Sequence, residues 1–134
     1  MNRPGLVTTI AVGGLVAFLV APTEAAQKHR AHVASGTYDG LWSVSIYTAY
    51  GPCDPTYRYP ARIVGGRVVQ AENNFSYQIS GAVVASGAIG VTVYRGGQSA
   101  TGYGRLRGSS GSGRWSAGGN MCYGTWSAMR RAAN

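Results

Sequence analysis

Apolar and polar residues alternate along most of the chain after residue 36, with a period of two. In the segment 57–63 the odd positions are aromatic or apolar, and the even positions are arginine or proline. Successive side chains of a strand point to opposite faces, so this pattern predicts a strand with one buried face. Three further segments show such an inward row: Phe75, Tyr77, Ile79 and Val83; Ile89, Val91 and Val93; Ala100, Gly102, Gly104 and Leu106.

Glycine-rich turn signals separate these rows at short intervals. Gly65-Gly66 is typical of a tight hairpin, because glycine adopts positive φ without a steric penalty. We expect the six residues 108–113 to form a hairpin loop. The predicted strands are 37–49, 57–64, 67–71, 75–84, 88–95, 99–107, 113–117 and 121–131.

Short connections between about eight strands predict an antiparallel meander. Such a sheet buries its edges by closing on itself, so we expect an all-β domain folded as an approximately eight-stranded barrel. The inward row of residues 100–106 contains two glycines, so it leaves space for large side chains from the opposite wall of the barrel. We expect Trp42, Tyr57 and Tyr59 to fill that space and the barrel interior to be mostly packed.

The first 25 residues are typical of a secretory signal peptide. Arg3 precedes an uncharged apolar run at 6–20, and Thr23 and Ala25 suit cleavage after Ala25. The alternative is an uncleaved membrane anchor, but the run is shorter than the roughly 20 residues that a spanning helix needs. We therefore expect export to the periplasm or the medium, a flexible lead-in at 26–36, and a single domain at 37–134.

Two cysteines, Cys53 and Cys122, are expected to form one disulfide, because an even count in an exported chain favours pairing. The alternative, a metal site, would need further ligands, and none cluster near them. In a closed meander the last strand runs beside the first. Cys53 follows the first predicted strand and Cys122 opens the last, so a disulfide between them agrees with a closed barrel.

The formal net charge is +8. It favours anionic partners, although a charge of this size also serves plain solubility. Arg105, Arg107 and Arg114 flank one predicted hairpin on its outward side, and together they are a candidate anion-binding surface. For an exported protein the matching partner is an anionic envelope polymer rather than a specific nucleic acid.

The tripeptide Gly-x-Trp occurs three times, at Trp42, Trp115 and Trp126, which are all the tryptophans of the chain. Closure places Trp42 and Trp126 on adjacent strands. Arg130 shares a face with Trp126, and we expect it to pack over Trp42 as a cation–π contact. Each indole N–H is expected to find a carbonyl partner.

A Gly-x-Trp on the first strand with an arginine late on the last resembles the lipocalin and avidin group of barrels. The resemblance covers Gly40, Trp42 and Arg130 or Arg131 only, and it implies that Trp42 and the arginine plug one end of the barrel, while the other end takes a small ligand. We expect Trp126, on the adjacent strand, to join Trp42 and Arg130 in this plug. The chain is shorter than a lipocalin and lacks the lipocalin helix, so the resemblance does not extend to a pocket.

A second resemblance covers most of the chain after the signal peptide. The segments DGLWSVSI, GPCDPTYRYPARI, GRLRGSSGSGRWS and GTWSAMRR are similar to a family of small exported proteins from rhizobia and related alphaproteobacteria. Some members of this family are loosely labelled as haem utilisation or adhesion proteins. Haem binding usually needs an axial His, Met, Cys or Tyr. Both histidines, His29 and His32, fall in the predicted lead-in, and we expect no cofactor.

No residues combine into a catalytic arrangement. The domain holds no histidine, and its carboxylates, Asp39, Asp54 and Glu72, fall near turns or strand starts. We therefore expect a non-catalytic binding module for a small apolar or anionic ligand. The alternative is a structural or interaction protein that has a filled barrel and acts through its basic surface. The residues expected to line a ligand site are Tyr57, Tyr59, Phe75 and Tyr77.

Overall fold

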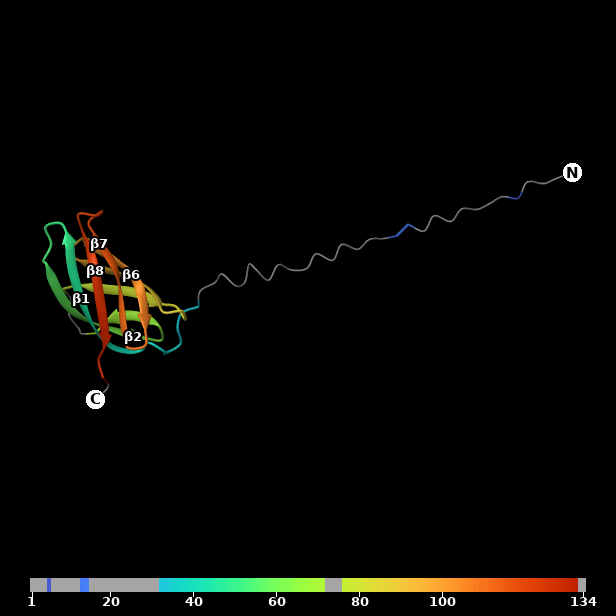
Figure 1. Ribbon diagram of the computed structural model, residues 1–134, viewed down its shortest axis with the longest axis horizontal. Helices are drawn as coiled ribbons and strands as arrows, with labels where there is room; N and C mark the ends of the chain where they lie inside the picture. Colours follow the sequence, from blue (N-terminus) through green and yellow to red (C-terminus); the bar gives the residue numbers. More distant parts are fainter. Residues whose placement is uncertain (1–4, 6–12, 15–31, 72–75, 133–134) are drawn as a thin grey trace.

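The chain folds into one closed antiparallel β-barrel (Figure 1). A computed structural model describes residues 5, 13–14, 32–71 and 76–132. The predicted signal peptide, apart from residues 5, 13 and 14, therefore lies outside the described residues, and so does Phe75. The strands are β1 (Gly40–Tyr50), β2 (Thr56–Val64), β3 (Arg67–Gln70), β4 (Gln78–Val83), β5 (Ala88–Arg95), β6 (Gln98–Arg107), β7 (Ser110–Ala117) and β8 (Cys122–Arg130).

The barrel closes because β8 pairs with β1, and Figure 1 shows the two strands side by side. The register joins Trp42 to Arg130 at one end and Tyr50 to Tyr123 at the other. The predicted disulfide is confirmed: Cys53 and Cys122 are bonded, with their Cα atoms 6.2 Å apart. All-β architecture, eight strands and closure are therefore as the alternation and the turns predicted.

The prediction that residues 108–113 form a six-residue hairpin loop is wrong. Arg107 pairs directly with Ser110, so only two residues form the turn, and β7 begins at Ser110. The two later glycines of the segment belong to the strand for a packing reason. A Cβ at Gly111 would lie 2.3 Å from a Leu106 side-chain carbon. The glycines that resembled loop residues in the sequence therefore serve close packing inside the barrel.

The first strand begins at Gly40 rather than at residue 37, because the chain bends before it. Asp39 lies in this bend, and its carboxylate accepts hydrogen bonds from the N–H groups of Gly65 (2.8 Å) and Gly66 (3.1 Å). Both glycines have positive φ. Asp39 thus holds the β2–β3 hairpin against the start of β1.

The described part of the predicted lead-in is docked on the barrel. Ala34 N–H donates to the carbonyl of Val83, and Ala85 N–H donates to the carbonyl of His32. Ala34 is only 3% exposed. Residues 32–36 therefore extend the sheet beside the end of β4, which corrects the expectation of a flexible segment at these positions.

The two ends of the barrel differ. We call the end where β1 starts and β8 ends the closed end, and the opposite one the mouth. Trp42, Leu106 and Val83 are almost fully buried near the closed end. The described residues contain no helix long and apolar enough to cross a membrane.

Candidate functional site

An apolar cavity of about 260 Å³ runs inside the barrel from the mouth toward the closed end. Trp42 and Leu106 line its deep end. Tyr57, Arg95 and Gln98 lie at the mouth ends of their strands and line the cavity there. Its walls include residues of the inward rows predicted from the alternation, namely Tyr59, Ile79, Ile89, Val91, Val93 and Ala100. Residues of β1, β7 and β8, such as Ile46, complete them. The expectation of a mostly packed interior is therefore wrong along this cavity, which reaches as far as Trp42 and Leu106.

The interior is hollow because the inward residues on one side of the cavity are small. Ala100, Gly102 and Ala117 line the cavity there. The side chain that covers the bare row on β6 is Trp126 and not Trp42, Tyr57 or Tyr59. A Cβ at Gly104 would lie 2.5 Å from the Trp126 ring, and one at Gly102 would lie 3.6 Å from its Nε1. Trp126 thus lies flat against the wall and leaves the centre of the barrel open.

Each indole N–H donates to a backbone carbonyl, as predicted. The acceptors are Tyr38 for Trp42 (2.9 Å), Tyr47 for Trp115 (3.0 Å) and Tyr103 for Trp126 (3.2 Å). These bonds satisfy the polar atoms of the tryptophans, so the rings present only apolar surface to the cavity.

Three tyrosines lie together on the β2–β4 side of the mouth. The rings of Tyr57 and Tyr59 are 5.9 Å apart, and those of Tyr59 and Tyr77 are 6.0 Å apart. Burial, with smaller contributions from Tyr77 and Tyr57, raises the pKa of Tyr59 from 10.0 to about 12. Tyr59 is therefore neutral at physiological pH and presents a hydroxyl rather than a negative charge. Tyr57 and Tyr59 line the cavity as expected, whereas Tyr77 contributes through its contact with Tyr59.

The mouth carries a cation that the sequence reasoning missed. Arg95 is the last residue of β5 and continues the inward row of Ile89, Val91 and Val93. It pairs across the hairpin with Gln98, and both residues are exposed and line the cavity. Extending the alternation by one step would have found it. Among the described residues, no carboxylate forms an ion pair with Arg95.

The closed end is plugged by Trp42 and Arg130. The Arg130 guanidinium carbon lies 5.2 Å from the centre of the Trp42 ring. Its nitrogens donate to the carbonyls of Thr37 (3.1 Å), Asp39 (3.2 Å) and Gly108 (2.9 Å). The predicted cation–π contact is therefore confirmed.

Trp126, which we expected to join this plug, lies four residues before Arg130 on β8. It packs on Gly104 and Gly113 instead. It therefore belongs to the cavity wall rather than to the plug.

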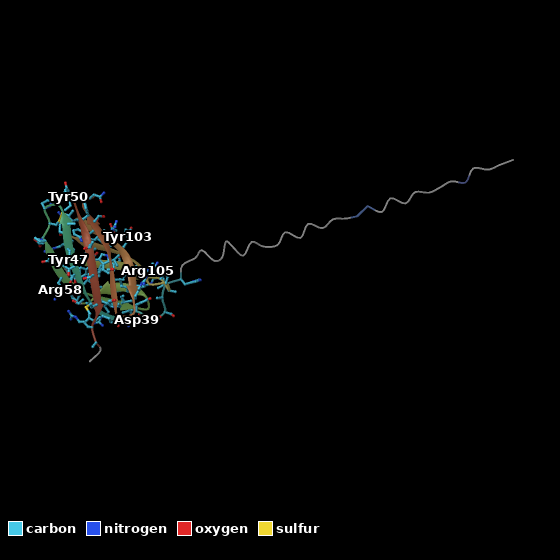
Figure 2. The ribbon with its side chains drawn as sticks, viewed as in Figure 1. Asp39, Tyr47, Tyr50, Arg58, Tyr103 and Arg105 are labelled. Atoms are coloured by element: carbon cyan, nitrogen blue, oxygen red, sulfur yellow. A yellow bond between two sulfur atoms is a disulfide. The ribbon has the colours of Figure 1, made fainter. Side chains whose placement is uncertain are left out.

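The three arginines of the predicted anion-binding surface lie on the outside of β6 and β7. Arg105, Arg107 and Arg114 are all exposed, and an open depression beside them is lined by Arg105, Arg107, Ser110, Gly111 and Ser112. Tyr103 pairs directly with Arg114 across the two strands. Figure 2 labels Tyr47, Tyr103 and Arg105 on this side of the barrel.

The described residues contain no group of three or more His, Cys, Asp or Glu side chains that could hold a metal ion. In comparisons with known proteins, no protein-family model, curated protein or solved structure matches the chain.

Proposed function

We propose that this protein is an exported, non-catalytic binding protein that holds a small amphiphilic ligand in its barrel. The observation that carries the proposal is the apolar cavity of about 260 Å³ with Arg95 at its mouth. An eight-stranded barrel is just wide enough to hold one small ligand. Concave, mostly apolar sites with a few polar groups are typical of small-molecule binding.

The ligand's chemistry follows from how polarity is distributed along the cavity. The deep end is formed by apolar side chains such as Trp42 and Leu106, and all three indole N–H groups are already bonded. Polar groups gather at the mouth as Arg95, Gln98 and the hydroxyl of Tyr57. A molecule with an apolar body and an anionic or polar end matches this order, because its charged end stays at the mouth and avoids desolvation.

The volume limits the size of the apolar body. An apolar cavity of about 150 Å³ is known to hold one benzene ring. A cavity of about 260 Å³ therefore suits a body between one and two such rings, or a short alkyl chain. A long lipid would extend out of the mouth.

Export is supported by two features that come from different parts of the chain. The first 25 residues are typical of a signal peptide, and the Cys53–Cys122 disulfide is the kind of bond that persists in oxidising compartments. In the periplasm or the medium, such a barrel would capture or carry a small amphiphile. This role needs no reaction and no cofactor.

The proposal is tested by binding a matched series of probes, octanoate, octanol and octylamine, to the mature chain with its disulfide formed. All three tryptophans line the cavity, so intrinsic fluorescence reports occupancy, and calorimetry measures affinity. We expect octanoate to bind more tightly than octanol, and octylamine to bind most weakly. Failure of every member of the series to bind would contradict the proposal.

Two variants locate the site. Ala100→Leu places extra carbon atoms in the cavity and should weaken octanoate and octanol alike. Arg95→Gln should weaken octanoate about two- to fivefold, which is the range of an exposed ion pair, and leave octanol unchanged. Arg62→Gln removes the same charge from the outside of β2 and serves as the matched control. An equal loss in Arg95→Gln and Arg62→Gln would show that the net charge, and not the mouth, attracts the anion.

The alternative function was an interaction protein with a filled barrel and an active basic surface. Its first premise does not hold, because the barrel is hollow along the cavity. The basic surface lies on the outside of β6 and β7, so it can act beside an occupied cavity.

A further inference from the structure

The outer side of β1, β8, β7 and β6 presents an unusual set of side chains, and we call it the platform face. Hydroxyl-bearing residues fill most of its outward positions, with tyrosines and arginines among them. Its serines and threonines are Ser43, Ser45, Ser99, Thr101, Ser110, Ser112, Ser116, Thr125 and Ser127.

Strand register arranges these residues in continuous rows across the barrel. One row consists of Ser45, Ser127, Ser112 and Arg105, each paired with the next on the neighbouring strand, and it continues onto the adjoining strand β2 at Arg58, the partner of Ser45. It has small hydroxyls in the middle and an arginine at each end.

The adjacent row consists of Tyr47, Thr125, Arg114 and Tyr103. Since neighbouring strands are about 4.8 Å apart, Tyr47 and Tyr103 are roughly 14 Å apart along the surface. Figure 2 labels both tyrosines, together with Arg58 and Arg105 at the ends of the first row.

The aromatic rings of the platform face are held in place but accessible. Tyr103 is 66% exposed, and a Cβ at Gly90 would lie 3.6 Å from two of its ring carbons. The ring thus packs over Gly90 at ordinary van der Waals distance. Tyr50 and Tyr123 stack at 5.1 Å beside the mouth. Exposed aromatic rings next to arginines are the residues that binding surfaces favour.

The charge of the platform face has one sign. None of the four strands contains Asp or Glu, and Glu72 is the last acidic residue of the whole sequence. Arg105 and Arg114 are diagonal neighbours across β6 and β7, a relation that places residues about 7–8 Å apart. Neither has a carboxylate partner among the described residues, so the surface is complementary to an anionic partner.

We infer that the platform face binds an acidic polysaccharide that lies across the strands. Arginines meet the carboxylates of such a polymer, the small hydroxyls exchange hydrogen bonds with its sugar hydroxyls, and tyrosine rings cover the apolar faces of its sugar rings. The two rows match an extended polymer better than a single ion, because Arg58 and Arg105 are four strands apart. This site is distinct from the cavity, and its ligand does not compete with the cavity ligand.

The experiment measures binding of the mature chain to polygalacturonate, to its fully methyl-esterified form and to single-stranded oligothymidylate. We expect polygalacturonate to bind, with an affinity that falls as salt rises, and the uncharged ester to bind far more weakly. Excess octanoate should leave this binding unchanged. If oligothymidylate of equal charge binds as tightly as polygalacturonate, the surface attracts any polyanion and the assignment to a polysaccharide is overturned.

Matched variants separate the platform face from the overall charge. The double variant Arg105→Gln/Arg114→Gln should lose roughly tenfold in affinity, as expected for two exposed charge contacts. Arg62→Gln/Arg67→Gln removes the same two charges from β2 and β3, and it should change affinity little at physiological salt. Equal losses in the two double variants would overturn the inference.

The aromatic contribution is tested separately with Tyr103→Ser. We expect a loss of about fivefold at every salt concentration, because the contact is not electrostatic. Unchanged affinity in this variant would exclude the tyrosine contact and with it the proposed arrangement of the sugar rings.

Discussion

Gly113 lies directly opposite Trp126, and Trp115 lies directly opposite Gly124. The two Gly-x-Trp copies on β7 and β8 therefore pair so that each tryptophan faces the other copy's glycine. Each ring extends over that glycine and donates its N–H two strands away, from Trp126 to Tyr103 and from Trp115 to Tyr47. The repeat is thus one reciprocal packing device, and it flattens both rings against the wall of the cavity.

This pairing predicts that Gly113→Ala is destabilising. The new Cβ would lie 2.0 Å from the Tyr103 carbonyl oxygen and 2.7 Å from the Trp126 Nε1, so the ring and the strand must move. We expect the free energy of unfolding to fall by about 1–3 kcal/mol in urea denaturation, which is typical of overpacking. Gly90→Ala is the control, since its Cβ would make only ordinary contacts at 3.6 Å. Similar losses in both variants would contradict the packing role.

Arg130→Lys should weaken the plug at the closed end. Lysine keeps the charge, but it lacks the planar group that lies over Trp42 and bonds three carbonyls at once. We expect a loss of about 1–3 kcal/mol in the free energy of unfolding. Arg131→Lys, at the exposed neighbouring position, should change stability little and gives the matched control. If Arg130→Lys left the free energy of unfolding unchanged, the positive charge alone would be enough to stabilise the closed end.

Removing the disulfide should lower stability strongly. Cys53 and Cys122 are 69 residues apart in sequence, and the chain-entropy model assigns about 4 kcal/mol to a loop of this length. We expect the Cys53→Ser/Cys122→Ser variant to unfold at a lower urea concentration than the oxidised chain. The comparison should be made with the reduced wild-type chain as well. If reduced and oxidised chains unfold together, the disulfide does not stabilise the barrel.

Tyr59 should make stability depend on pH in the alkaline range. Its pKa is about 12 in the folded chain against an ordinary value of 10.0, so the unfolded chain loses this proton first. The stabilisation is fully present below pH 10 and is lost as pH rises from 10 to about 12. Linkage gives a loss on the order of 2–3 kcal/mol for the whole interval.

The check is urea denaturation at a series of pH values, with absorbance titration of the tyrosines. In Tyr59→Phe the stability should fall less steeply above pH 10 than in the wild-type chain. Tyr103→Phe, at a 66% exposed position, is the control and should leave the pH dependence unchanged. Identical pH dependences in wild type and Tyr59→Phe would contradict burial of this hydroxyl.

Local pattern alone determined the architecture of this protein. The alternation at 57–63 and the pair Gly65-Gly66 are properties of neighbouring residues, and they located strands and turns. Closure was favoured because it lets an eight-stranded meander bury its edges. The positions of Cys53 and Cys122 then agreed with that closure, and the structure contains the predicted disulfide.

Only the tertiary structure decided how the interior is filled. Period two tells which residues point inward, but it does not tell how deep a ring reaches or which strand it crosses. Trp126 covers the glycines of β6 from two strands away, and this contact leaves the cavity open. Gly111 and Gly113 resembled loop residues because the sequence alone does not show which side chains pack on them. Their role depends on Leu106 and Trp126, which only the folded barrel brings beside them.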